Sequence, residues 1–240
     1  MELLLTNTQG KAFVINVNDT TVPYQKVEYL ENTNSAQFMH VYQNPQAGAF
    51  SSFDFEIRLR FSVLPTSGYI GSGITSGSSV QFFVGANVAS ATGIYMCFGP
   101  SSTGTLVKQL ANSDKSGWHT YRAVSDGTTC TYYLDGEQVF QHDKGSVNIG
   151  TNQITLFRMT NSQSYAGKQQ ISYFKFSRNG ELVRDLIPVR VSNVGYMYDK
   201  VSGQLFSNDG TGNFVIGPDM PSKALVIEHT PGYITDGLTN

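Results

Sequence analysis

The sequence predicts an all-β protein, built as an antiparallel β-sandwich. Charged residues make up only 14% of the chain, and 24 of its 240 residues are Gly, a balance typical of a sandwich with many tight turns. Residues 52–63 alternate strictly between apolar and polar side chains, as a strand with one buried face does. Residues 117–137 have the composition of two strands joined by a turn. Because 40% of the residues are hydrophobic, a chain of this length can bury a sizeable core.

The segment 117–137 is the clearest hairpin. Residues 121–124 alternate outward and inward, and Ser125-Asp126-Gly127 turns the chain. Residues 129–134 are β-branched and aromatic, as in a half-buried strand. Asp135-Gly136 makes the next turn, because Gly accepts the positive φ that a tight hairpin requires.

Further strands are expected in order along the chain. Apolar runs within residues 3–17 predict a small N-terminal hairpin, and residues 27–33 open the main domain. Residues 65–77 and 160–168 are rich in small or polar side chains and are expected to be loops. Asn179-Gly180 is expected to close a hairpin, since both residues accept left-handed backbone. The other expected strands are 37–42, 80–84, 93–98, 105–110, 139–142, 153–159, 171–177, 181–190, 195–199, 204–207 and 213–217.

Two motifs resemble a known family. Trp118-His119 opens one strand and Asp135-Gly136 closes the next, a pattern similar to that of the laminin-G-like, concanavalin A-like jelly-roll superfamily. Val27-Glu28-Tyr29-Leu30 resembles the opening of such domains in bacterial and phage surface proteins. The resemblance covers about residues 25–219 and implies a jelly roll, with Trp118 in the core or at its edge and His119 in a structural role.

The expected organisation has three parts. Residues 1–22 form an N-terminal extension with the small hairpin, residues 23–219 the laminin-G-like jelly-roll domain, and residues 220–240 a linker leading to another module. The resemblance implies a location in a virion or at a cell surface. The N-terminus lacks the basic region and the long apolar run of a signal peptide.

Composition and charge exclude several partners. The net charge is −2 and no run of Lys or Arg occurs, so the sequence predicts no binding to nucleic acid. No apolar stretch approaches the ~20 residues of a membrane span, so no membrane insertion is expected. Cys97 and Cys130 lie in strand-like runs, which favours two buried thiols over a single cross-strand disulfide.

Catalytic patterns are missing, so the protein is predicted not to be an enzyme. Glycosidases of the superfamily carry carboxylates on one strand as Glu-x-Asp-x-Glu or Glu-x-Asp-x-x-Glu, and no such run occurs. Asp54-Phe55-Glu56 comes nearest, but the neighbouring Arg58 and Arg60 indicate an ion-paired polar face. The four His residues have no metal-ligand spacing.

A glycan or a host cell-surface receptor is the partner that the resemblance favours. Sugar binding needs exposed aromatic rings with amides nearby, and the candidates are Tyr69, Asn87, Tyr95, Asn161 and Tyr165. No cofactor is required by the sequence. Calcium is the one metal with candidate ligands, which are Asp126, Asp143 and Asp209, although each is equally well explained as a turn residue.

The sequence therefore favours a non-catalytic, lectin-like recognition or adhesion module of a phage virion or bacterial surface protein. Two alternatives stay open: a structural virion or adhesion domain that binds no glycan, and a glycosidase-related domain that lacks the catalytic carboxylates. The oligomeric state is not predicted.

Overall fold

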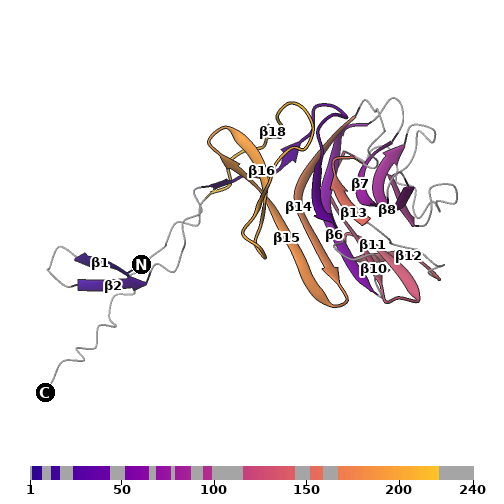
Figure 1. Ribbon diagram of the computed structural model, residues 1–240, viewed down its shortest axis with the longest axis horizontal. Helices are drawn as coiled ribbons and strands as arrows, with labels where there is room; N and C mark the ends of the chain where they lie inside the picture. Colours follow the sequence, from indigo (N-terminus) through magenta and orange to yellow (C-terminus); the bar gives the residue numbers. More distant parts are fainter. Residues whose placement is uncertain are drawn as a thin grey trace, which may run out of the picture.

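A computed structural model describes residues 2–6, 12–16, 24–43, 52–64, 69–76, 79–87, 94–98, 116–143, 152–158 and 167–221. Those from residue 24 onward form an antiparallel β-sandwich of the jelly-roll class (Figure 1), which confirms the predicted fold. These residues contain no helix, and therefore none long and apolar enough to cross a membrane.

The larger sheet has the strand order β12-β11-β10-β6-β14-β15-β16-β17. Three short strands extend it, because β3 pairs with β15 and β4 pairs with both β14 and β18. The strands are β3 (Gln25–Lys26), β4 (Leu30–Glu31), β6 (Phe53–Val63), β10 (His119–Ser125), β11 (Thr129–Leu134), β12 (Glu137–Asp143), β14 (Lys168–Arg178), β15 (Glu181–Val191), β16 (Val194–Asp199), β17 (Leu205–Phe206) and β18 (Val215–Ile216).

The smaller sheet has the order β5-β13-β7-β8-β9. Its strands are β5 (Met39–Gln43), β13 (Asn152–Leu156), β7 (Tyr69–Ser76), β8 (Ser79–Asn87) and β9 (Ile94–Phe98). The loop predicted for residues 65–77 is wrong for residues 69–76, which form β7. Gly71 permits a close approach of the two backbones, because a Cβ there would collide with the Val84 carbonyl of β8.

The core lies between the two sheets. Strand β6 shows the predicted alternation, with its odd-numbered residues from Phe53 to Phe61 buried and facing the smaller sheet. Rings meet within and across the layers: Phe55 and Phe174 have centroids 5.0 Å apart, and Tyr42 and Phe176 5.3 Å. The even-numbered residues of β6 therefore point away from the smaller sheet.

Tight turns join several neighbouring strands as predicted. Asp135 (φ 52°) and Gly136 (φ 87°) link β11 to β12, and Asn179 (φ 50°) and Gly180 (φ 81°) link β14 to β15. Positive φ at both central residues defines the type I′ hairpin turn. The predicted N-terminal hairpin is confirmed as a separate sheet of β1 (Glu2–Thr6) and β2 (Ala12–Asn16). The strand predicted at 105–110 lies outside the described residues.

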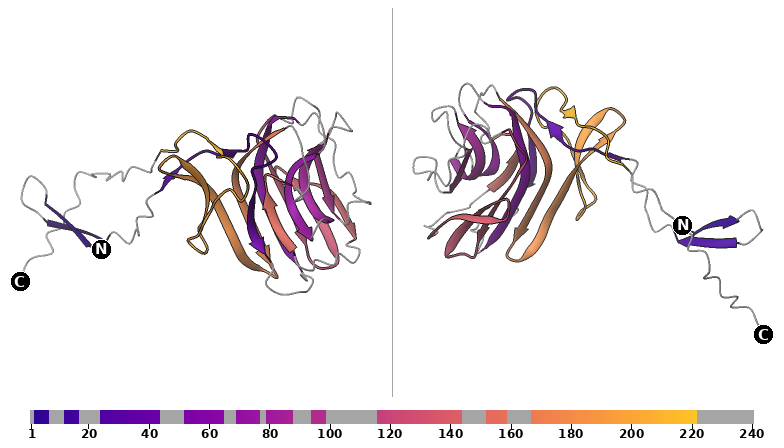
Figure 2. Two further views of the ribbon diagram at one scale, coloured as in Figure 1. Left: turned by 45° about the horizontal axis from the view of Figure 1, so that its top comes forward. Right: turned by 180° about the vertical axis from the view of Figure 1, so that it is seen from behind.

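Within the predicted opening segment, residues 27–33, only Leu30–Glu31 form a strand. The backbone just before that strand bonds to the last described residues of the sandwich. Val27 bridges Asp219, and Met220 donates its backbone N–H to the Lys26 carbonyl at 2.9 Å. The N–H of Glu28 bonds to the Pro218 carbonyl, also at 2.9 Å. The first and last described segments of the sandwich thus lie side by side at one end (Figure 2).

Candidate functional site

The larger sheet turns one face away from the smaller sheet, and we call it the outward face. A depression of ≈ 280 Å³ lies on it, close to the turn that joins β14 to β15. Its lining comes from strands β6, β10, β14 and β15, and consists of Asp54, Glu56, Arg122, Lys175, Ser177 and Leu182. The outward face further carries Arg58, Arg60, Thr120, Tyr133 and Tyr173, with Trp118 and Tyr29 at one end.

Strand register places these residues in rows across the sheet. Glu56 lies between Arg122 of β10 and Lys175 of β14, and one row along, Arg58 lies between Thr120 and Tyr173. A β-bulge between Ile171 and Tyr173 makes the second row possible. Ile171 is buried in the core, so without the extra residue Tyr173 would point inward as well.

Arg122 binds Asp54 through two parallel hydrogen bonds. Its Nε donates to Oδ1 at 2.9 Å and its Nη2 to Oδ2 at 2.6 Å. The hydrogen bond to Asp54 raises the pKa of Arg122 above its usual value. Glu56 Oε2 lies 3.9 Å from the same Nε. The predicted ion-paired polar face is therefore present, with Arg122 rather than Arg58 or Arg60 as the partner.

Tyr173 is tied to the second carboxylate of the depression. Its hydroxyl donates to Glu56 Oε1 at 2.9 Å, and Nζ of Lys175 lies 5.8 Å from its ring centroid. Burial raises the pKa of Tyr173, and the bond to Glu56 adds to this effect, whereas Thr120 and Arg58 oppose it. The phenol is therefore protonated at neutral pH and acts as a hydrogen-bond donor.

Aromatic rings and arginines gather at one end of the outward face. The guanidinium carbon of Arg60 lies 5.1 Å from the Trp118 ring centroid and 5.9 Å from that of Tyr29. The guanidinium carbon of Arg58 lies 5.9 Å from the Trp118 ring centroid, and the centroids of the Trp118 and Tyr29 rings are 6.0 Å apart. Trp118 is half-buried here, on the surface of the sheet rather than between the two sheets.

The Trp-His and Asp-Gly motifs are joined by hydrogen bonds. Asp135 Oδ1 accepts from the backbone N–H of Thr120 at 2.8 Å, and its Oδ2 lies 2.7 Å from His119 Nδ1. These bonds fix the start of β10 to the end of β11, which agrees with the structural role expected for His119.

The predicted sugar-contacting residues divide between two places. Tyr69 and Asn87 are register partners in β7 and β8, and Tyr95 pairs with Gly85 in β9, so these three positions share the smaller sheet. Strands rather than loops thus hold them. Asn161 and Tyr165 lie outside the described residues.

The predicted calcium ligands have protein partners where their side chains are described. Asp126 Oδ1 accepts from the backbone N–H groups of Thr128 and Thr129 at 2.7 and 2.8 Å, as a turn residue does. Asp209 Oδ2 bonds to His40 N at 2.6 Å and lies 3.0 Å from its Nδ1. The described residues contain no group of three or more potential metal-ligating side chains. Asp143 ends β12, and its side chain lies outside the described part.

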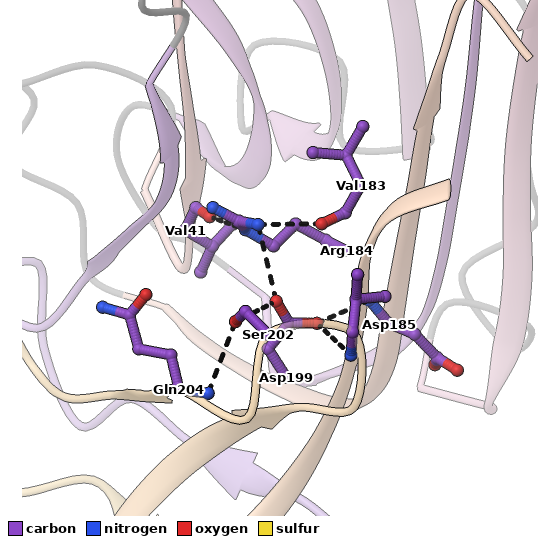
Figure 3. A network of polar contacts seen from close by, with 8 residues as sticks. Val41, Val183, Arg184, Asp185, Asp199, Ser202 and Gln204 are labelled. Atoms are coloured by element: carbon purple, nitrogen blue, oxygen red, sulfur yellow. Dashed lines mark hydrogen bonds and ion pairs between the residues drawn. The ribbon is translucent and has the colours of Figure 1, made fainter. Parts of the chain in front are cut away.

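A second polar cluster surrounds Asp199 in the interior (Figure 3). Asp199 Oδ1 accepts from the N–H groups of Asp185 and Val201 at 3.0 and 3.1 Å, and Ser202 Oγ donates to Oδ2 at 2.7 Å. Arg184 Nη1 lies 3.4 Å from Asp199 Oδ2. The same guanidinium donates to the backbone carbonyls of Val41 and Val183 at 2.7 and 2.8 Å. Both oxygens of the buried Asp199 carboxylate are thus held by protein groups, which indicates a structural role.

Comparison with known proteins shows the fold. No family model matches the chain, and no curated protein matches its sequence. One similar structure is that of a protein from Bacteroides ovatus ATCC 8483, provisionally described as carbohydrate binding, with TM-score 0.55 and 13% identity over 80% of this chain. The chain spans 60% of the length of that protein.

Two more distant solved structures are similar to part of the chain. They are the alginate lyase AlgAT5 of polysaccharide lyase family 7 (TM-score 0.47, 9% identity, 74% of this chain, 94% of that chain) and galectin LEC-6 from Caenorhabditis elegans (TM-score 0.33, 11% identity, 57% and 96%). At 13% identity, the likeness to the Bacteroides ovatus protein shows a common fold alone.

Proposed function

We propose that this protein is a non-catalytic carbohydrate-binding module and that sugar binds on the outward face. One observation carries the proposal: half-buried aromatic rings alternate there with hydrogen-bonding and charged side chains. Tyr29, Trp118, Tyr133 and Tyr173 supply the rings. Rings cover the apolar face of a pyranose while polar groups orient its hydroxyls.

The dimensions favour an extended ligand. Between Asp54 and Arg60 the strand rises about 20 Å, at about 3.4 Å per residue. The depression is open and its volume is only ≈ 280 Å³, so it encloses no complete oligosaccharide. A glycan chain lying across the sheet fits this surface better than a single sugar in a deep pocket.

A binding role rather than hydrolysis is proposed because both carboxylates of the depression are occupied. Glycoside hydrolysis needs a protonated carboxyl group and a second carboxylate, both facing the scissile bond. Both oxygens of Asp54 bind Arg122, and Glu56 accepts the Tyr173 hydroxyl. The laminin-G-like relationship belongs to the same proposal and is supported by the Trp-His and Asp-Gly motifs. The proposed location on a virion or cell surface rests on the resemblance of Val27-Glu28-Tyr29-Leu30 to domains of bacterial and phage surface proteins.

A glycan array probed with the whole chain tests the function. We expect signals on a defined set of glycans, and a structural domain predicts none. The strongest glycan is then titrated against Trp118→Ala, which should weaken binding by about 2 kcal/mol or more, as for interface anchors. The matched control is Phe38→Ala, since Arg158 also stacks on Phe38, at 4.7 Å, next to the smaller sheet. Equal affinities of the two variants would place the sugar elsewhere.

A further inference from the structure

The outward face carries positively charged side chains that lie outside its ion pairs. Asp185 lies opposite Lys175 in the strand register, but it pairs with Lys200 at 2.6 Å. Arg122 is paired with Asp54, and Glu56 lies 3.9 Å from the same guanidinium. Within the described part of the chain, Arg58, Arg60 and Lys175 form no ion pair. These three side chains are the cations that a ligand would meet.

Arg60 is held in place by neutral groups. Its Nε donates to Gln170 Oε1 at 2.5 Å, and its guanidinium packs against the rings of Trp118 and Tyr29. Gln170 in turn binds Glu31, which also accepts from Ser62 at 2.7 Å. Glu31 is thus linked to Arg60 only through the Gln170 side chain. Among the described residues, nothing accepts a hydrogen bond from its two terminal nitrogens.

Arg58 and Lys175 extend the positive surface towards the depression. Both are exposed. Arg58 lies near enough to Asp135 to lower the pKa of that carboxyl without pairing with it. Lys175 is diagonal to Arg58 on the neighbouring strand, where side chains are about 7–8 Å apart. The three cations therefore line one continuous stretch beside the aromatic rings.

We propose that the glycan bound here is acidic and that its carboxylate groups bind Arg58 and Arg60. This inference rests on the proposed function, which it narrows to one class of ligand. A guanidinium presents paired N–H donors in the plane and spacing of a carboxylate, so arginine is suited to a uronate. The Trp118 ring lies beside both guanidinium groups and is placed to stack on the same sugar residue.

The test is a glycan array that holds uronate-containing, sulfated and neutral glycans in equal number. We expect the uronate-containing glycans to bind, and we expect methyl esterification of their carboxylates to weaken binding by about tenfold or more. Binding should also weaken as NaCl is raised. Signals on neutral glycans alone would overturn the inference while leaving the proposed function intact. Signals on sulfated glycans alone would reject the carboxylate, and no signal at all would reject the proposed function.

Variants connect the result to the named residues. Arg58→Gln removes an exposed charge and should weaken uronate binding by about tenfold, because a charge-assisted hydrogen bond is lost. Arg60→Gln should do the same, and Arg60→Lys should restore only part of the affinity, because lysine lacks the planar fork. Arg190→Gln is the control, since Arg190 pairs with Asp219 outside the outward face. Unchanged affinity in Arg58→Gln and Arg60→Gln proteins that melt like the wild type would disprove the inference.

Discussion

Arg184 and Asp199 form an ion pair inside the sandwich, with Nη1 and Oδ2 3.4 Å apart and the carboxylate fully buried. Arg184 also donates to two backbone carbonyls, and the Asp199 carboxylate accepts from two backbone N–H groups and from Ser202. Removing either charged side chain should therefore destabilise the fold, because the partner would remain buried without a counter-charge.

Asp199→Ala should therefore lower the free energy of unfolding by about 3–5 kcal/mol, measured by urea denaturation. It leaves Arg184 without its counter-charge and two backbone N–H groups without acceptors. The control is Asp219→Ala, which breaks an ion pair to Arg190 of 2.7 Å at an exposed site. That change should leave the denaturation midpoint nearly unchanged, and equal losses for the two variants would show that burial is not the cause.

Asp135→Asn should reduce stability in a pH-dependent manner. Burial raises the pKa of Asp135, but hydrogen bonds from His119 and the Thr120 backbone outweigh it and lower the pKa below its usual value. The folded state thus gains stability from the carboxylate above about pH 4 and loses it as the pH falls through the lowered pKa.

Thermal melts between pH 7 and pH 3 measure the effect. Asn keeps the left-handed turn that Asp135 adopts at φ 52°, so the variant isolates the charge. We expect the wild type to have the higher melting temperature at pH 7. The difference in free energy of unfolding should be less than about 1 kcal/mol, because the side chain is half exposed. The gap between the two proteins should narrow as the pH falls from about 4 through the lowered pKa of Asp135, and a gap of constant size between pH 7 and pH 3 would assign the effect to the turn.

No glycoside hydrolysis is expected. Incubation with a panel of β-glucans should release no reducing ends, because Asp54 and Glu56 are held by Arg122 and Tyr173. Glu56→Gln should be equally inactive. Release by the wild type that Glu56→Gln abolishes would identify the depression as an active site.

The site predicted from the sequence at Asn161 and Tyr165 can be tested directly against the outward face. Titrating one bound glycan with Tyr165→Ala and Tyr173→Ala compares the two on the same scale. We expect Tyr173→Ala to weaken binding by about 1–3 kcal/mol, as for interface anchors, and Tyr165→Ala to have the smaller effect. The reverse order, with unchanged melting temperatures, would return the site to residues 160–168.

Local patterns in the sequence predicted much of the fold. Period-two alternation identified β6 because both of its faces keep their character along the whole strand. Asn179-Gly180 marked its hairpin because few residues accept positive φ. The glycines of β7 were misleading, since Gly71 serves a close approach to β8 that only the folded sheet reveals.

The candidate site was harder to predict because it depends on pairing between distant segments. Residues 171–177 have mixed alternation, and the cause is the β-bulge that turns Tyr173 and Lys175 outward. That break in the alternation was the one feature of the sequence that could have indicated the bulge. For Trp118, a motif suggested the core or its edge, whereas its position depends on Arg58 and Arg60 of another strand.

The antiparallel contact between residues 26–29 and 217–220 determines how the sandwich bears mechanical load. A force that draws residues 24 and 221 apart acts across backbone hydrogen bonds that run perpendicular to the two segments. The bond between Met220 and Lys26 is loaded first, then that between Glu28 and Pro218, and then that between Gly217 and Tyr29. Because these bonds yield one after another, the sandwich should peel open from this edge under modest tension, long before the buried layer between its sheets carries any of the force.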